Sequence, residues 1–177
     1  MPIKGYKKEM SYLINMFKEE HINLHLIKKV LKDYHKTDFN FNSKYYQGKT
    51  LLHYVIENNI NNLIPLLVKY GCNPNICDDN YMTPLHLSVV IGNVQALKLL
   101  MKYGADINAV GEFEQTPLHL AVIYGNLKVT KLLIKHGADI LLVDEKNLSV
   151  LDYAKDEKNN VIINYLKNKI KTNKGEE

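Results

Sequence analysis

The apolar and polar positions of this chain recur with a period of 33 residues. A hydroxyl residue followed by a leucine-containing apolar run begins at Thr50, Thr83, Thr116 and Ser149. A second string, in which lysine and an aromatic ring precede glycine, keeps the same phase and begins at Lys69, Lys102 and Lys135. A constant period of this size predicts stacked repeats, because one such unit cannot bury its apolar face alone.

Each unit is predicted to hold two short helices. In the second unit, Thr83 can cap the first helix, and Pro84 suits a helical position that needs no N–H. We expect this helix to stop at Gly92, which tolerates a positive φ, and Asn93 to cap the next helix. In the first unit Pro65 lies inside the second helix, where it should kink or shorten the first turn.

The period and the motif Thr-Pro-Leu-His, which begins at Thr83 and again at Thr116, resemble the ankyrin repeat family. The resemblance covers roughly residues 40 to 170 and implies an all-α fold. That fold would be an ankyrin-repeat solenoid of helix-turn-helix units with β-hairpin-like connecting loops. The expected parts are an N-terminal helical cap (a degenerate repeat, 1–39), ankyrin repeats at 40–77, 78–110 and 111–143, a C-terminal capping repeat at 144–170 and a frayed basic tail at 171–177.

In this family the threonine and histidine of the motif build a structural turn. The resemblance therefore assigns to that turn Thr50, His53, Thr83, His86, Thr116 and His119. The alternative interpretation is a column of metal ligands or proton shuttles, but these histidine positions follow the repeat and not a cluster of chemically active residues. The family also prefers glycine at the hairpin tips. Only Gly48 keeps it, so we expect an altered backbone at Tyr81, Glu114 and Asn147.

The composition narrows the choice of partners. Apolar residues make up 46% and charged residues 24%, as in ordinary soluble proteins. All 23 basic residues counted as Lys or Arg are lysines, and the net charge is +4. Because arginine supplies the bidentate fork for phosphate and guanine, we expect no nucleic-acid partner. No apolar run is long enough to cross a membrane, so we expect no membrane partner.

The cysteines and the amino-terminal residues bear on the compartment. Cys72 occupies a small-residue position and Cys77 lacks a second cysteine pair, so we expect free thiols in a reducing interior. The beginning of the chain lacks a signal-peptide core. We expect a cytoplasmic location. The lysine-, asparagine- and isoleucine-rich composition also suggests an AT-rich genome, and a secreted effector would instead occupy the host cytosol or nucleus.

No catalytic arrangement is evident in the sequence. It has no glycine-rich phosphate loop, nucleophile elbow or cysteine–histidine pairing. We therefore expect no enzyme, no cofactor and no metal.

The resemblance also implies where a partner would bind. Hairpin tips and first helices line a concave face in ankyrin-like stacks. The corresponding positions that we expect to bind a partner are Tyr46, Met82, Val90, Ile91, Glu112, Phe113, Gln115, Ile123 and Tyr124. Exposed apolar and aromatic patches usually mark interaction sites. The alternative is that some of these side chains pack between repeats, above all Val90 and Ile123.

These expectations lead to one functional prediction and one alternative. The chain is predicted to be a monomeric, non-enzymatic protein–protein interaction module that docks a partner protein on its concave face. It would act as an adaptor or a masking inhibitor, including as a pathogen or viral effector on a host protein. The alternative is a self-associating structural unit, a homodimer formed through the apolar concave patch.

Overall fold

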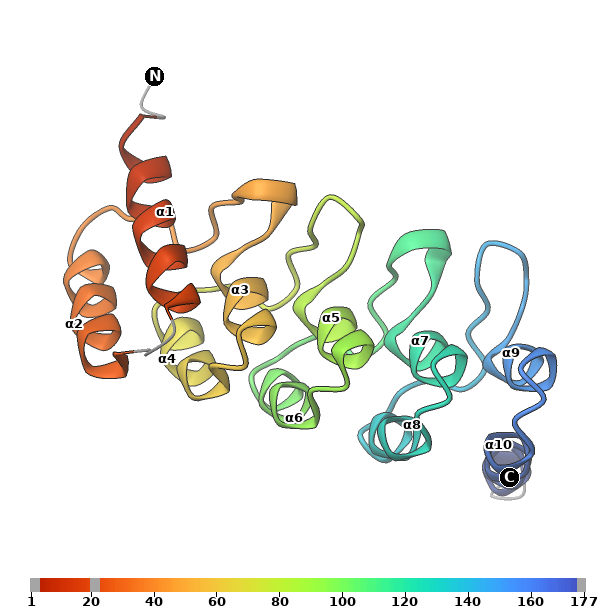
Figure 1. The fold of residues 1–177 in the computed structure, drawn as a ribbon. Helices are drawn as coiled ribbons and strands as arrows, with labels where there is room; N and C mark the ends of the chain where they lie inside the picture. Colours follow the sequence, from red (N-terminus) through yellow and green to blue (C-terminus); the bar gives the residue numbers. More distant parts are fainter. Residues whose placement is uncertain (1–3, 20–22, 175–177) are drawn as a thin grey trace.

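The computed structural model describes residues 4–19 and 23–174, which form an elongated stack of helix pairs (Figure 1). The helices are α1 (Lys4–Lys18), α2 (Leu24–His35), α3 (Leu51–Glu57), α4 (Ile64–Lys69), α5 (Pro84–Ile91), α6 (Val94–Lys102), α7 (Pro117–Ile123), α8 (Leu127–Lys135), α9 (Val150–Asp156) and α10 (Asn160–Lys174). Short 3-10 turns are η1 (Tyr46–Gly48), η2 (Asn61–Leu63) and η3 (Glu112–Glu114). The described residues contain no strand, only an isolated bridge between Val143 and Ser149. The all-α repeat fold predicted from the sequence is confirmed.

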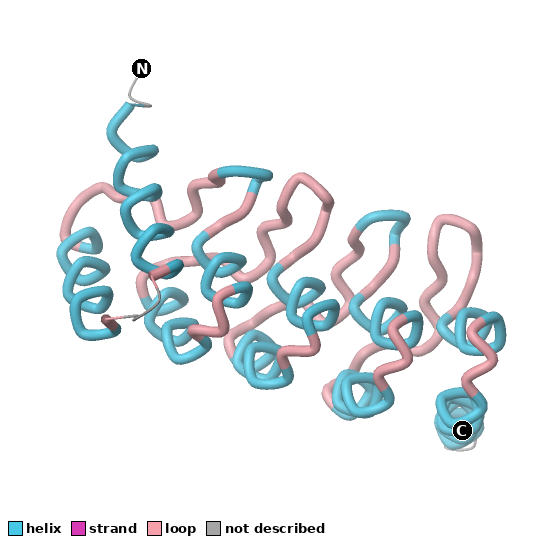
Figure 2. Tube along the Cα trace, in the orientation of Figure 1, coloured by secondary structure: helices cyan, strands magenta, loops and turns pink. Residues whose placement is uncertain are grey.

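The stack has two helical layers and a row of hairpin loops. The first helices α3, α5, α7 and α9 form one layer, and α4, α6, α8 and α10 form the other (Figure 1). Each first helix packs against its own second helix and against the first helix of the next repeat. The loops that precede the first helices project together from one side of the stack (Figure 2).

The helix ends follow the predicted capping chemistry. Thr83 Oγ1 accepts the backbone N–H of His86 at 3.4 Å, and Pro84 occupies the first turn of α5. The helix ends at Gly92, whose φ is 75°. Asn93 Oδ1 then accepts the N–H of Ala96 at 3.0 Å and begins α6. The capping predictions for this unit are confirmed.

The second helix of the first unit is shortened, as its proline predicts. The turn before Pro65 is the 3-10 turn η2, and α4 comprises only 6 residues with the proline near its start. A proline there lacks the N–H that a longer helix would use and would clash with the preceding turn.

One apolar core runs through the whole stack. Leu97 and Leu100 of α6 and Leu133 of α8 are fully buried, whereas Leu99 is half-buried at the edge of the core. The amino-terminal helices extend this core with buried residues of their own: Met10, Leu13, Ile14, Met16, Phe17, Ile27 and Leu31. Helices α1 and α2 therefore cover the end of the stack next to α3 and α4.

The hairpin tips differ from the sequence-based expectation. Tyr81, Glu114 and Asn147 adopt φ values of 57°, 57° and 59°, in the same left-handed region as Gly48 at 68°. The expectation of an altered backbone is therefore wrong. Each tip is held by a backbone hydrogen bond three residues back, such as Glu114 N–H to Gly111 O at 3.2 Å. The tip residue therefore keeps a left-handed backbone whether or not it is glycine, and the three residues with side chains are strained there.

The carboxyl-terminal helix is longer than expected. We expected a frayed tail from residue 171, but α10 continues to Lys174, and residues 175–177 lie outside the described part. Buried Ile162 and Leu166 attach the helix to the stack.

Candidate protein-docking surface

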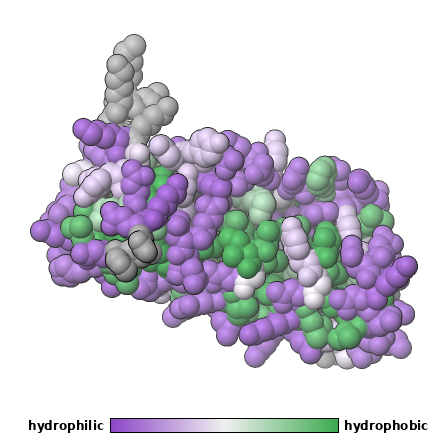
Figure 3. All heavy atoms as spheres, in the orientation of Figure 1, coloured by the Kyte–Doolittle hydropathy of each residue, from purple (hydrophilic) through white to green (hydrophobic). Residues whose placement is uncertain are grey.

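A hollow of about 430 Å³ opens between the hairpins and first helices of the last three repeats. We call it the groove. Its lining residues are Met82, His86, Val90, Glu112, Phe113, Gln115, Leu120, Ile123, Tyr124 and Tyr153. Seven of the nine residues expected to bind a partner are among them. On the face in view, hydrophobic residues gather over the middle of the stack with hydrophilic residues around them (Figure 3).

Two of the expected residues lie outside the groove. Tyr46 is 70% exposed in η1, at the tip of the first hairpin. Ile91 is 48% exposed at the end of α5. Neither lines the hollow. The seven expected residues that do line it all belong to the second and third repeats.

The groove lies between two hairpins that are not bonded to each other. Backbone hydrogen bonds join the first hairpin to the second, Asp79 N–H to Gln47 O at 3.0 Å, and the third to the fourth, Glu145 N–H to Phe113 O at 3.1 Å. Within the described residues no corresponding backbone bond joins the second hairpin to the third. Met82 lines the groove from the second hairpin, and Phe113 lines it from the third.

The polar part of the groove is a chain of three side chains. Gln115 Nε2 donates to Tyr153 Oη at 2.9 Å, and the Tyr153 hydroxyl donates to Asp144 Oδ2 at 2.5 Å. Asp144 Oδ1 also accepts the N–H groups of Lys146 and Leu148, both at 2.9 Å. These polar groups satisfy one another and hold Gln115 in place.

The environment of Asp144 keeps its carboxylate charged. Burial by itself raises the pKa of Asp144, but the hydrogen bonds from Tyr153 and from the Leu148 and Lys146 amides outweigh it. The resulting pKa lies below the ordinary value. For Tyr153, burial first and then the hydrogen bond to Asp144 raise the pKa, so this hydroxyl stays protonated and remains a donor.

Sequence reasoning missed His86, Leu120 and Tyr153 as lining residues. Tyr153 contacts the groove from the fourth repeat, which was treated as a cap. The available signal was a tyrosine where the second and third units carry Leu87 and Leu120.

Phe113 is the most strained residue of the groove. It has φ 55° within η3 and is followed by Glu114 at φ 57°, so two consecutive side chains occupy the left-handed region. A left-handed conformation costs a non-glycine residue roughly 1–2 kcal/mol. The ring is nevertheless 51% exposed, with Lys146 Nζ 5.8 Å from its centroid. Gln47 has a similar φ of 58° at the corresponding position of the first hairpin, so this backbone belongs to the hairpin type.

The motif histidines fix the backbone beneath the groove. His86 Nδ1 accepts the Thr83 backbone N–H at 3.3 Å, so the ring proton is on Nε2, which donates to Gln115 O at 3.1 Å. His53 bonds Met82 O in the same way at 2.9 Å. Each of these two groove residues is therefore anchored by the preceding repeat.

These histidines are neutral at neutral pH. Burial lowers the pKa of His86 to about 4, because desolvation outweighs the hydrogen bonds that favour the charged form. Burial also lowers the pKa of His53 and of His119. His119 differs from the others in one respect, since its buried Nε2 has no hydrogen-bond partner in the described structure. A neutral, buried imidazole suits a structural role better than proton transfer.

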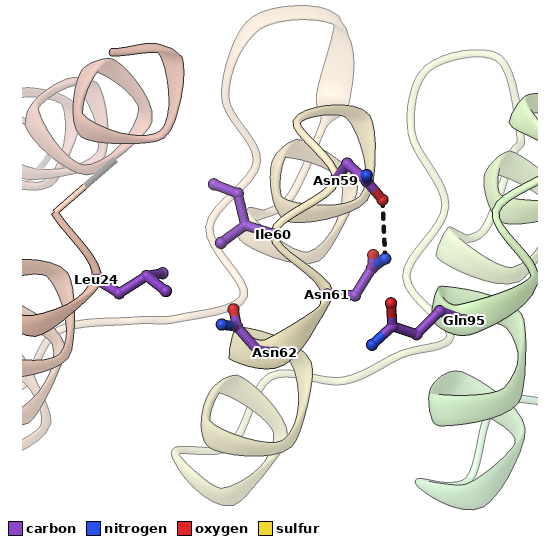
Figure 4. A pocket seen from close by; sticks show the side chains of 6 residues that line it. All are labelled: Leu24, Asn59, Ile60, Asn61, Asn62 and Gln95. Carbon is purple, nitrogen blue, oxygen red and sulfur yellow. Dashed lines mark hydrogen bonds between the residues drawn. The ribbon is translucent and has the colours of Figure 1, made fainter. Parts of the chain in front are cut away.

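A second hollow, of about 290 Å³, lies at the turn between α3 and α4 (Figure 4). Its polar lining is carboxamide. Asn61 donates to Asn59 Oδ1 at 2.9 Å and to Asn93 Oδ1 at 3.0 Å, and it accepts from Asn93 at 2.9 Å. These bonds between Asn59, Asn61 and Asn93 join neighbouring repeats.

Within the described residues, no group of three His, Cys, Asp or Glu side chains could hold a metal ion. Among the helices that are described, none is long and apolar enough to cross a bilayer. Cys72 and Cys77 are free, and burial raises the pKa of the Cys72 thiol to about 12, so it is not an activated nucleophile.

Comparison with known proteins returned matches at the family level. A family model described as ankyrin repeats (3 copies) matches residues 13–111. A second model, described as ankyrin repeats (many copies), matches residues 100–154. No curated protein matches the chain.

Proposed function

We propose a function from one premise, which is that the chain belongs to the ankyrin repeat family. Repeats of this family are generally protein–protein interaction modules and generally non-enzymatic. The proposal is that this chain docks a partner protein in the groove and has no catalytic activity of its own.

The observation that carries the proposal is the exposure of aromatic side chains at the groove. Phe113 and Tyr124 are 51% and 58% exposed, and both line the same hollow as Met82. Aromatic residues and methionine are enriched at the centres of protein interfaces.

The same surface supports a finer proposal. A stack with one groove would act as an adaptor or as an inhibitor that masks a partner's surface. The free cysteines support a reducing compartment, and we place the protein in the cytoplasm. The arginine-free composition supports an origin in an AT-rich genome, so an effector in the cytosol or nucleus of a host is included in the proposal.

The test compares two double variants with the unaltered chain. Affinity purification with the unaltered chain first supplies a partner, and its Kd is then measured by calorimetry. Phe113→Ala combined with Tyr124→Ala should weaken binding on the order of a thousandfold, since truncating an interface anchor costs about 2 kcal/mol or more. Thermal unfolding should show that the fold persists.

The matched control changes two exposed lysines of the opposite layer, Lys98→Ala with Lys128→Ala. Lys131 is less suitable because its Nζ lies 5.4 Å from the centroid of the Tyr165 ring. The control should bind as the unaltered chain does. Loss of binding by the lysine pair, with the aromatic pair unaffected, would move the docking surface to the second-helix layer.

The homodimer alternative is tested by the same variants. Sedimentation across a concentration series should show a monomer. A dimer that Phe113→Ala with Tyr124→Ala abolishes would instead support self-association through the groove.

A further inference from the structure

We propose that the groove takes a basic segment of its partner, a stretch in which lysine or arginine side chains flank an aliphatic or aromatic one. This inference rests on the proposed docking function and specifies the chemistry of the partner.

The first support is the separation of charge within the two repeats that form most of the groove. Their hairpins and first helices carry Asp78, Asp79, Glu112 and Glu114 and no lysine. Their second helices carry Lys98, Lys102, Lys128, Lys131 and Lys135 and no acidic residue. Within these two repeats the side that lines the groove is therefore acidic, although the whole chain has a net charge of +4, and Lys146 of the fourth hairpin is a cation beside it.

Three carboxylates at the edge of the groove, those of Glu112, Glu114 and Glu145, are available to a partner. Glu112 lines the hollow, and Glu114 and Glu145 are exposed on the hairpins beside it. The ion pairs found among the described residues involve none of these three. Unpaired carboxylates next to an apolar hollow attract cations and repel anions, and this effect also steers association.

A cation already lies against the aromatic wall. Lys146 Nζ is 5.8 Å from the centroid of the Phe113 ring, within the range at which a ring face attracts a positive charge. The backbone bond between Glu145 and Phe113 keeps the fourth hairpin next to this ring. A lysine or arginine of the partner would find the same combination of ring face and carboxylates.

The apolar lining of the groove explains why the partner segment should contain an aliphatic or aromatic side chain. Met82, Val90 and Ile123 supply aliphatic surface within a hollow of about 430 Å³. The polar groups there, Gln115 and Tyr153, already bond to each other and, through Tyr153, to Asp144. An apolar side chain can therefore enter without leaving these groups unpaired.

Charge also argues against other occupants. A second copy docked face to face would set Glu112 and Glu114 against their own counterparts. A nucleic acid would place phosphates against the same carboxylates. Like charges brought together at an interface disfavour binding.

The experiment uses the full chain labelled with ¹⁵N and three short synthetic peptides. One alternates lysine with leucine, one alternates glutamate with leucine, and one alternates lysine with serine. Backbone NMR shifts locate each peptide, and calorimetry gives its Kd. We expect the lysine–leucine peptide to shift the signals of Met82, Phe113 and Tyr124, and to bind at least tenfold more tightly than the other two.

Two double variants remove equal charge from different places. Glu112→Gln with Glu145→Gln should weaken binding of the lysine–leucine peptide at least tenfold, measured as its Kd. The control, Asp106→Asn with Asp139→Asn, removes two charges from the turns that follow α6 and α8 and should change Kd less than twofold. Asparagine retains the oxygens that accept the Asn108 and Leu141 amides there.

The outcomes separate this inference from the docking function. Equal loss in both double variants would show general charge attraction and overturn the basic-segment proposal. Tighter groove binding by the glutamate–leucine peptide would also overturn it, while leaving docking in place. If the lysine–serine peptide bound as tightly as the lysine–leucine peptide, the claim that an apolar side chain anchors the segment would be wrong. If no peptide shifts a groove signal, or the shifts fall on the second helices, both proposals fail.

Discussion

The motif histidine shows how a single residue connects two repeats. Its Nδ1 closes the turn with the threonine of its own repeat, and its Nε2 reaches a carbonyl of the next, as His86 does with Gln115. In the fourth repeat the position is Asp152, whose Oδ2 accepts from the Ser149 hydroxyl at 2.6 Å. A carboxylate suffices there because the described stack has no fifth repeat for a second nitrogen to reach.

The buried histidines predict a loss of stability on mild acidification. The unfolded chain takes up a proton near the ordinary pKa of 6.5, whereas folded His86 does so only near about 4. The unfolded state therefore binds more protons between these values, and stability falls as pH decreases through them. Urea unfolding should show a loss of about 2 kcal/mol from His86 alone between about pH 7 and pH 5.

The variant His86→Asn provides the comparison. It should lower stability at pH 7, because the bond to Gln115 is lost, and its pH dependence over the same window should be weaker. An unchanged slope in this variant would mean that other groups cause the acid sensitivity.

The strained hairpin tips predict a stabilising substitution. Glu114 bears a side chain at φ 57°, which costs roughly 1–2 kcal/mol, while glycine there loses about 0.5–1 kcal/mol of additional chain entropy. Glu114→Gly should therefore raise the unfolding free energy by about 0.5–1 kcal/mol. Asn147→Gly is the control and should change little, since asparagine tolerates this conformation. A destabilised Glu114→Gly chain would contradict the strain argument.

Among the elements, the four hairpins share one closing hydrogen bond but have two kinds of tip. Each closes with a backbone bond of the same register, such as Asp78 N–H to Met82 O at 3.0 Å. Asp78 and Asp144 each hold two further amides with their carboxylates, and one left-handed residue completes the tip. Where Tyr45 or Gly111 replaces the aspartate, the tip contains two consecutive left-handed residues. This substitution places Phe113 in its strained position at the groove.

For the helices, losing a cap should lower the unfolding free energy less than losing a core side chain. Thr83→Ala removes one capping hydroxyl and should cost about 1 kcal/mol. Leu100→Ala leaves a cavity between repeats at a fully buried position and should cost about 2–5 kcal/mol. Urea titrations in which the cap variant is the less stable of the two would reverse this order.

The sequence predicts the elements well because their determinants are local. A threonine, a proline and a glycine at fixed spacing determine where α5 begins and ends, and the same set repeats 33 residues later. The tips were not predictable in this way. Their left-handed residues are stabilised by the hydrogen bonds that close each hairpin, and the residue types Tyr81 and Glu114 have no local preference for this conformation.

The site was predictable only in part for a similar reason. The resemblance to ankyrin repeats predicts that Met82, Phe113 and Tyr124 lie on one concave face, and the structure brings them to one hollow. The bond between Gln115 and Tyr153 joins residues 38 apart in different repeats, which no local pattern indicates. The docking role of these residues stays a prediction until a partner is measured.

For the whole molecule, charge is sorted by layer. The helices α2, α4, α6, α8 and α10 carry 13 lysines and one acidic residue, Asp33. The rest of the described residues carries the other 10 lysines and 15 acidic residues. A partner approaching at low salt would meet fields of opposite sign on the two sides, which favours one orientation of docking.

The carboxyl-terminal end of the stack is closed by charge. Position by position, the buried Ile56, Val89 and Val122 of the first three repeats correspond to Lys155 in the fourth. Lys155 Nζ lies 2.9 Å from Asp152 Oδ1, the residue that replaces the motif histidine. The surface that an interior repeat buries against its neighbour is thus occupied by an exposed ion pair, which contributes little to stability but keeps that surface polar.

Replacing the charged residues at positions 152 and 155 by those of the interior repeats should cause the carboxyl-terminal end of the stack to self-associate. Asp152→His with Lys155→Val gives the fourth repeat the side chains that the second and third bury, without a neighbour to cover them. Histidine can still close the turn, as it does at Thr83 and Thr116, so the helices should form and the far-ultraviolet circular dichroism should be unchanged. The exposed apolar surface should drive self-association, visible as a sedimentation coefficient that rises with concentration. Lys167→Val, an exposed lysine on α10, is the control and should remain monomeric. A double variant that also stays monomeric would show that the ion pair is not what ends the stack, and the long helix α10 would then be the element to shorten.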